Sequence, residues 1–113
     1  NKKMANTFKN SITGSVGTSG VIAYRTPSAT TTTVIGVSVA NAAAQNISVS
    51  AMVRSSTENK CVYLVKDALI PQGGASVLVG GEQKLVLGAN DFISVTSSLA
   101  NSADVVVSVL EVS

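Results

Sequence analysis

The chain has 113 residues, of which 45% are hydrophobic and 12% are charged, with two Phe, two Tyr and no Trp. This length suits one domain with a single core, and the hydrophobic share is too high for a disordered segment. Eight Lys and Arg residues against six Asp and Glu give a formal charge of +2, and they are scattered, so nothing in the charge favours nucleic-acid binding. The chain has no His and a single cysteine, Cys61, which excludes a disulfide framework within one chain.

Apolar and small polar residues alternate in several short runs, which indicates β-strands. The run 31–41 (TTTVIGVSVAN) places Ile35, Val37 and Val39 on one face of a strand. The run 46–54 (NISVSAMVR) alternates in the same way, and no stretch of ten or more residues has a helical apolar period. We therefore expect nine β segments, at residues 8–16, 21–24, 31–41, 46–54, 61–66, 75–79, 82–87, 91–96 and 105–112.

Gly, Pro, Asn and Ser separate these segments about every ten residues, a spacing typical of β-sandwiches and barrels. Turns are expected at residues 17–20, at Pro27, and at residues 40–45, 55–60, 71–74, 80–81 and 88–90. The expected fold is all-β, an antiparallel β-sandwich of jelly-roll or related Greek-key type over residues 10–113. The polar residues 1–9 are expected to form an extended N-terminal arm that a neighbouring subunit holds in place.

The last run, 105–112 (VVVSVLEV), is apolar on both faces. One interpretation is a central strand that the domain covers on both sides. The other is a strand with one face against another subunit.

Few residues of the chain suit catalysis or metal binding. Without His, a Ser or Cys nucleophile lacks its usual base, and Cys61 is expected in the apolar core. The glycines match neither GxGxxG nor GxxxxGK[ST], and they are expected in turns. Asp91 and Asp104, with Asn90 and Asn101, are expected to cap turns, and a shared cation such as calcium is the alternative. We expect no enzymatic activity and no cofactor.

The scarcity of bulky side chains predicts self-association, because burying surface against copies of the chain stabilises a small core. We expect a homo-oligomer, most simply a trimer. Subunit contacts are expected in the arm and in the threonine run, whose hydroxyls suit hydrogen bonding across an interface; a solvent-facing strand start is the alternative for the threonine run. The residues expected in these contacts are Met4, Asn6, Thr7, Phe8, Lys9, Thr30, Thr31, Thr32 and Thr33.

Several stretches resemble a family of small virion structural proteins of tailed bacteriophages, particularly those of marine bacteria and cyanobacteria. The resemblance lies in MANTFKNSITGSVGTS, TPSATTTTVIGVSVAN, CVYLVKDALIPQGGASVLVGGEQKLVLGANDFISVTSS and SADVVVSVLEVS. It covers nearly the whole chain from Met4, a candidate start; residues 1–3 depart from the pattern.

The resemblance implies a β-rich part of a phage particle without catalytic residues. We expect a capsid decoration or cement protein that bridges subunits of the major capsid protein. The alternative is a tail-associated, fibre or receptor-binding module. No apolar stretch has the length of a signal peptide or membrane helix, so we expect assembly in the host bacterial cytoplasm, no membrane partner, and a final location in the virion.

Overall fold

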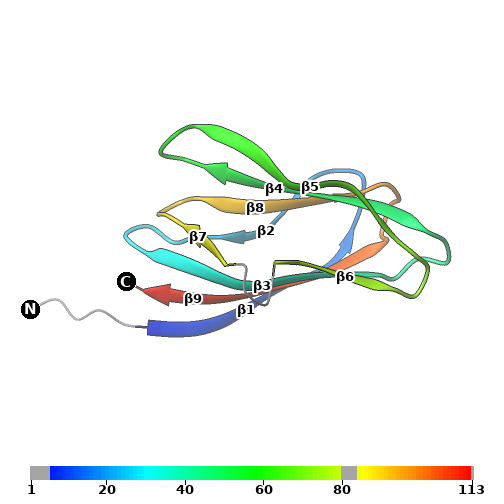
Figure 1. Cartoon of the computed structure of the whole chain (residues 1–113), viewed down its shortest axis with the longest axis horizontal. Helices are drawn as coiled ribbons and strands as arrows, with labels where there is room; N and C mark the ends of the chain where they lie inside the picture. The colour runs from blue at the N-terminus through cyan, green and yellow to red at the C-terminus, as the bar shows by residue number, and fades with distance from the viewer. Residues whose placement is uncertain (1–5, 80–83, 113) are drawn as a thin grey trace, which may run out of the picture.

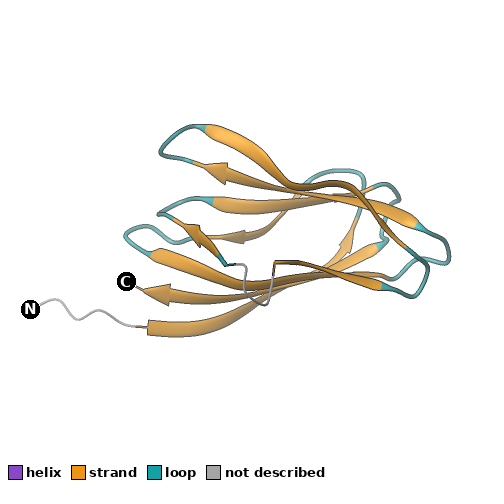
Figure 2. Cartoon of the chain, in the orientation of Figure 1, coloured by secondary structure: helices purple, strands orange, loops and turns teal. Residues whose placement is uncertain are grey.

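The computed structural model describes residues 6–79 and 84–112, and these form β-strands joined by turns (Figure 1, Figure 2). The described strands are β1 (Asn6–Val16), β2 (Val21–Arg25), β3 (Thr31–Asn41), β4 (Ile47–Ser55), β5 (Lys60–Ile70), β6 (Ala75–Val79), β7 (Leu85–Leu87), β8 (Phe92–Ser97) and β9 (Ala103–Val112). The predicted all-β class is confirmed. The turns expected at residues 17–20, 71–74 and 88–90 lie between strands, whereas the glycine pair 80–81 lies outside the described residues.

The strands form two antiparallel sheets that pack face to face as a β-sandwich (Figure 1). The larger sheet has the order β1-β9-β3-β6, and β7 pairs with β3 beside β6. The smaller sheet has the order β2-β8-β4-β5. Along each strand every second side chain points into the space between the sheets, and together these side chains form the core, as the period of two in the sequence requires.

The strand pairs are nested like a single long hairpin rolled into two layers. The hairpin β4–β5 is innermost, and β3–β6, β2–β8 and β1–β9 follow outward along the chain. Two further antiparallel pairs, β3–β9 and β4–β8, close the sheets. The first and last strands of the chain are therefore neighbours, and Lys9 pairs with Val109.

The core consists almost entirely of Val, Ile and Ala side chains between the sheets. In β9, Val105, Val107 and Val109 are fully buried and alternate with more exposed residues. Full burial of each side chain of this size contributes about 1.5–3 kcal/mol to stability, so many small residues together compensate for the scarcity of aromatic ones. The valine-rich composition therefore supplies a core without a large anchor.

The prediction that Ile35 shares the core face with Val37 and Val39 is wrong. Val34 pairs with Val109 and Gly36 pairs with Ser108, so Ile35 is the extra residue of a β-bulge. The bulge turns Val34 into the core together with Val37 and Val39, and all three are fully buried. In β4, by contrast, Ile47, Val49 and Ala51 share the core face as expected.

The boundary predicted between an N-terminal arm and the domain is also corrected. Residues 6–9 are not an arm separate from the sandwich, because they form the first part of β1 and pair with residues 109–112 of β9. The main-chain groups on one side of this segment find partners in β9, and this pairing makes the segment part of the sheet of its own chain. Residues 1–5 lie outside the described residues.

The last strand is central in its sheet, between β1 and β3. One of its faces lies in the core, but no described layer covers the other, where Val106 is exposed. The interpretation of a strand covered on both sides within the domain is therefore wrong for the described residues.

The described residues contain no helix of the length and hydropathy that a membrane-spanning segment needs.

Candidate functional site

The structure brings the two predicted contact segments together on either side of the end of β9. On one side, Phe8 of β1 pairs with Leu110, and on the other side Thr33 of β3 pairs with the same residue. In the same way, Asn6 and Thr31 both pair with Val112, and Thr7 and Thr32 both pair with Glu111. Segments more than twenty residues apart in the sequence thus form one continuous part of the larger sheet.

The pleat of the sheet divides the predicted residues between its two faces. Residues directly opposite each other share a face, so Asn6, Phe8, Thr31 and Thr33 point outward. Thr7, Lys9 and Thr32 point to the other face. The expectation that Thr30 and Thr32 are available for a subunit contact is wrong, because both are buried; Met4 lies outside the described residues.

Exposed apolar side chains gather on the outward side of the larger sheet, which we call the outer face. Five of them are large and exposed, namely Phe8 (74%), Ile12 (77%), Val77 (70%), Val86 (65%) and Val106 (38%). Strand pairing aligns them with smaller residues in two rows that cross four strands, Ile12–Val106–Ser38–Val77 and Phe8–Leu110–Thr33–Val86. Each row spans about 14 Å at the usual spacing between strands. A contiguous apolar surface of this kind is typical of an interaction site.

A hollow of about 150 Å³ lies beside the first residues of β1, lined by Phe8, Lys9, Asn10, Ile35, Ser108 and Val109. The Ser108 hydroxyl donates a hydrogen bond of 3.0 Å to Oδ1 of Asn10. The bulge residue Ile35, which sequence reasoning placed in the core, therefore borders this hollow instead.

Charge is nearly absent from the outer face. Among the described outward positions of β1, β9 and β3, the charged residue is Asp104, at the far end of β9 from Phe8. Lys9 is close to Phe8 in sequence, but its Nζ lies 3.4 Å from Oε1 of Glu111 on the inward side. The outer face is thus suited to contacts by shape and apolar burial rather than by ion pairing.

A buried polar cluster lies between the sheets at this same end. The Tyr24 phenol donates a hydrogen bond of 2.5 Å to Oε2 of Glu111, and its oxygen lies 2.9 Å from Oγ1 of Thr32. Because the phenol proton is directed to Glu111, the Thr32 hydroxyl donates to the phenol oxygen. Burial and the neighbouring Glu111 carboxylate raise the pKa of Tyr24 to about 12. A phenol held neutral in this way is a structural donor and not a base.

Sequence reasoning missed this cluster. The signal was present as one glutamate in an otherwise apolar last strand, since an acidic residue on a core-facing position needs partners. The identity of those partners, Tyr24 and Lys9, depends on which strands are neighbours.

The two aspartates do not come together. Asp91 precedes β8 and Asp104 lies near the start of β9, so they stand at opposite ends of the sandwich. Oδ1 of Asp91 accepts a hydrogen bond from the Ser56 amide (2.8 Å), Oδ2 accepts one from Gly88 (2.9 Å), and Asp104 accepts one from Ser15 (3.0 Å). The bond from Gly88 to Asp91 agrees with the predicted role in turns, whereas that prediction is wrong for Asp104, which lies in β9 and binds Ser15 of β1.

Asn90 and Asn101 have φ angles of 67° and 52°, the left-handed region that Asn tolerates well in turns. Within residues 6–79 and 84–112, no group of three or more Cys, Asp or Glu side chains could hold a metal ion. Asp91 and its neighbours instead tie the turn after β4 to the loop before β8.

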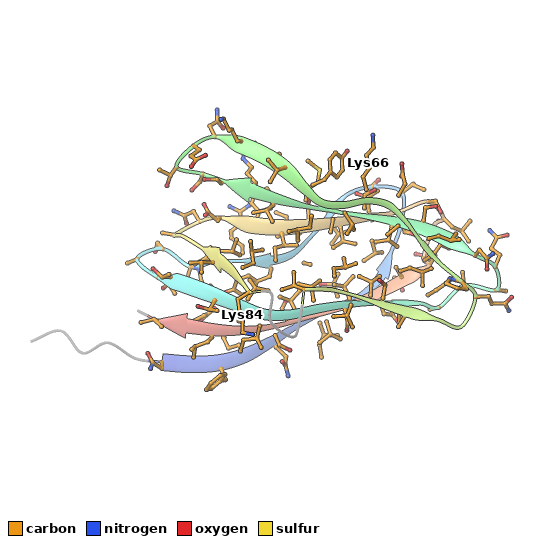
Figure 3. All side chains as sticks on the ribbon, in the orientation of Figure 1. Lys66 and Lys84 are labelled. Atoms are coloured by element: carbon orange, nitrogen blue, oxygen red, sulfur yellow. The ribbon has the colours of Figure 1, made fainter. Side chains whose placement is uncertain are left out.

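Cys61 is exposed on β5 and not in the core as expected. The β5 strand extends to Ile70, well past the predicted end at residue 66, and the residues of its first half remain open to solvent because it bounds the smaller sheet. Lys66 projects from β5 away from the sheets in Figure 3, and its Nζ lies 5.6 Å from the centre of the Tyr63 ring.

The four aromatic side chains do not form a common platform. Phe8 is on the outer face of the larger sheet, Tyr63 is on β5 of the smaller sheet, and Tyr24 is buried. The guanidinium of Arg25 lies 4.8 Å from the centre of the Phe92 ring. A sugar-binding surface built on stacked aromatics is therefore not assembled.

Comparison of the chain with protein-family models, with curated proteins and with solved structures gave no match.

Proposed function

We propose that the chain is a non-enzymatic structural protein of a tailed-phage virion, a capsid decoration or cement protein that binds the major capsid protein. The observation that carries the proposal is the outer face, which has few charges and carries two apolar rows across four strands. Such a face suits permanent contact with another protein surface better than solvent.

The strand order supports a jelly-roll assignment. Four nested pairs rolled into sheets ordered β1-β9-β3-β6 and β2-β8-β4-β5 are the arrangement that two Greek keys give. Jelly rolls recur in viral capsid proteins, and this recurrence supports a structural role in the virion by analogy of fold.

The mechanism is linkage between subunits of the shell. A protein that binds across the boundary of two shell subunits adds its own contacts to those that must break when the shell opens. Each copy contributes a rigid surface, because the outer face lies on paired strands and not on loops.

The first experiment counts copies of the protein in purified particles by quantitative mass spectrometry against the major capsid protein. A ratio near one-to-one supports a decoration protein. A few copies per hundred capsid subunits would move the proposal to the tail-associated or receptor-binding alternative.

A second experiment tests the outer face itself. Val77→Lys and Val86→Lys place charge on it without touching the core, and both are expected to abolish binding to shells that lack the protein. Ile22→Lys, on the exposed side of the smaller sheet, is the matched control and should bind normally. Equal binding by all three variants would contradict the proposed surface.

A further inference from the structure

The strands that bound the two sheets differ in how well they are protected against pairing with another chain. Natural sheets protect such edges with short strands, bulges and charged residues. Strands β2, β6 and β7 have only three to five residues, and β2 also has an irregularity in its pairing with β8. Strand β5 is long, but its pairing with β4 shifts twice, and it carries Lys60, Lys66 and Asp67, the last with a φ of 53°.

Strand β1 lacks these protections. It pairs with β9 without a break from Asn6 to Thr13, and its irregularity comes only after that stretch. Its other side has no partner among the described strands, so a row of main-chain donors and acceptors is open there. Its one charged side chain, Lys9, is directed to Glu111.

We propose that β1 pairs antiparallel with β1 of a second copy of this chain, around a two-fold axis that passes through Asn10. In this register Phe8 lies opposite Ile12 of the second copy, and Ile12 lies opposite its Phe8. Both are largely exposed in the single chain, and cross-strand pairs of aromatic and β-branched residues stabilise sheets. The four-residue spacing of the two side chains makes the strand complementary to itself.

The positive charge of Lys9 favours the same register. With the axis at Asn10, the two Lys9 residues each face Ser11 of the other copy and stay apart. With the axis at Lys9 the two lysines would face each other directly, which destabilises a strand pair. With the axis at Ser11, Phe8 would face Gly14 and the apolar pairing would be lost.

The contact is large enough for a specific dimer. Pairing of residues 7–13 forms about seven main-chain hydrogen bonds, within the range of about 10 ± 5 for a typical interface. The two outer faces then join into one continuous surface. The inference does not depend on the proposed function, and it replaces the trimer expected from the sequence with a two-fold dimer.

Analytical ultracentrifugation tests the dimer. The chain should sediment with twice its own mass, and the double variant Phe8→Lys/Ile12→Lys should raise the dissociation constant by about 100-fold, because like charges then face each other in both pairs. Val77→Lys, equally exposed on the outer face but on β6, should remain dimeric. A monomeric or trimeric parent chain, or a dimer indifferent to the double variant, overturns the proposal.

A cross-link tests the register independently of that variant. In a Cys61→Ser background, Asn10→Cys should give a covalent dimer on mild oxidation, since the two residues face each other across the axis. Val77→Cys in the same background is the control and should stay uncross-linked. Cross-linking no faster for Asn10→Cys than for the control overturns the register, and failure of the dimeric parent chain to bind shells that lack it would count against the proposed function alone.

Discussion

Tyr24 and Glu111 join the two sheets: the phenol on β2 donates a hydrogen bond of 2.5 Å to a carboxylate oxygen on β9. The carboxylate also lies near the ammonium group of Lys9 on β1. A contact that holds three strands from two sheets fixes the end of the sandwich where the outer face carries Phe8.

Removal of the phenol hydroxyl should destabilise the fold. In Tyr24→Phe the ring still fills its place, but Glu111 and Thr32 each lose a partner in a buried setting, so the free energy of unfolding should fall by about 1–3 kcal/mol. Urea denaturation followed by circular dichroism measures the change. Tyr63→Phe, on the exposed β5, is the control and should change it by less than about 0.5 kcal/mol.

Stability should fall in strong alkali because of the same residue. The folded state holds the pKa of Tyr24 at about 12, against 10 for the unfolded chain. Above pH 10 the unfolded chain releases this proton while the folded chain keeps it, so the stability present below pH 10 is lost progressively toward pH 12, by about 3 kcal/mol.

Two measurements check this pH dependence. Tyrosinate absorbance in Tyr63→Phe follows Tyr24 alone and should rise with a midpoint near 12. Between pH 10 and 12, the free energy of unfolding should fall more steeply with pH for the parent chain than for Tyr24→Phe. A midpoint at the ordinary value of 10 would contradict the buried hydrogen bond.

Two buried threonines at this end should respond in opposite ways to valine. Thr26 is fully buried and its hydroxyl has no hydrogen-bond partner among the described residues, so Thr26→Val should leave stability unchanged or raise it by about 1 kcal/mol. Thr32→Val removes the hydroxyl that bonds to Tyr24 and should lower it by about 1–2 kcal/mol. Melting temperatures of the pair decide the matter; equal shifts in the same direction would count against this assignment of partners.

Asp91 should act as a structural anchor and not as a cation ligand. Asp91→Ala removes the acceptor of two backbone amides, those of Ser56 and Gly88, and should lower stability by about 2–4 kcal/mol. Hydrogen exchange should speed up first at those two amides. Glu58→Ala, exposed and in the same turn as Ser56, is the control.

Added calcium tests the alternative role of Asp91 directly. Its carboxylate oxygens already accept hydrogen bonds from the protein, so millimolar calcium or EDTA should leave the melting temperature of the parent chain unchanged. A calcium-dependent rise that disappears in Asp91→Ala would restore the cation interpretation.

The strands could be predicted because their signal is local. Ile47, Val49 and Ala51 alternate with small polar residues, and a pleated strand turns every second side chain to one face. The prediction failed where the backbone departs from that period. At Ile35 one extra residue in β3 shifts the pattern, and nothing in the run TTTVIGVSVAN shows where the bulge falls.

The candidate site could be predicted only in part. The sequence marked the segments around Phe8 and Thr31 as contact regions, and the structure places both beside the end of β9. The sequence did not distinguish Thr32, which is buried, from Thr33, which points outward. That difference depends on which face of β3 the smaller sheet covers.

Local sequence patterns establish that the chain is made of β-strands with a valine core, since hydrophobic periodicity and turn residues act over a few positions. Which strands are neighbours depends on contacts between distant parts of the folded chain. The pairing of Lys9 with Val109, the meeting of Tyr24 with Glu111, and the unpaired edge of β1 all join residues far apart in the chain. Such contacts form because rolling the nested strands into two layers buries the valines of both sheets at once. No short stretch of the sequence predicts which strands pair in this way.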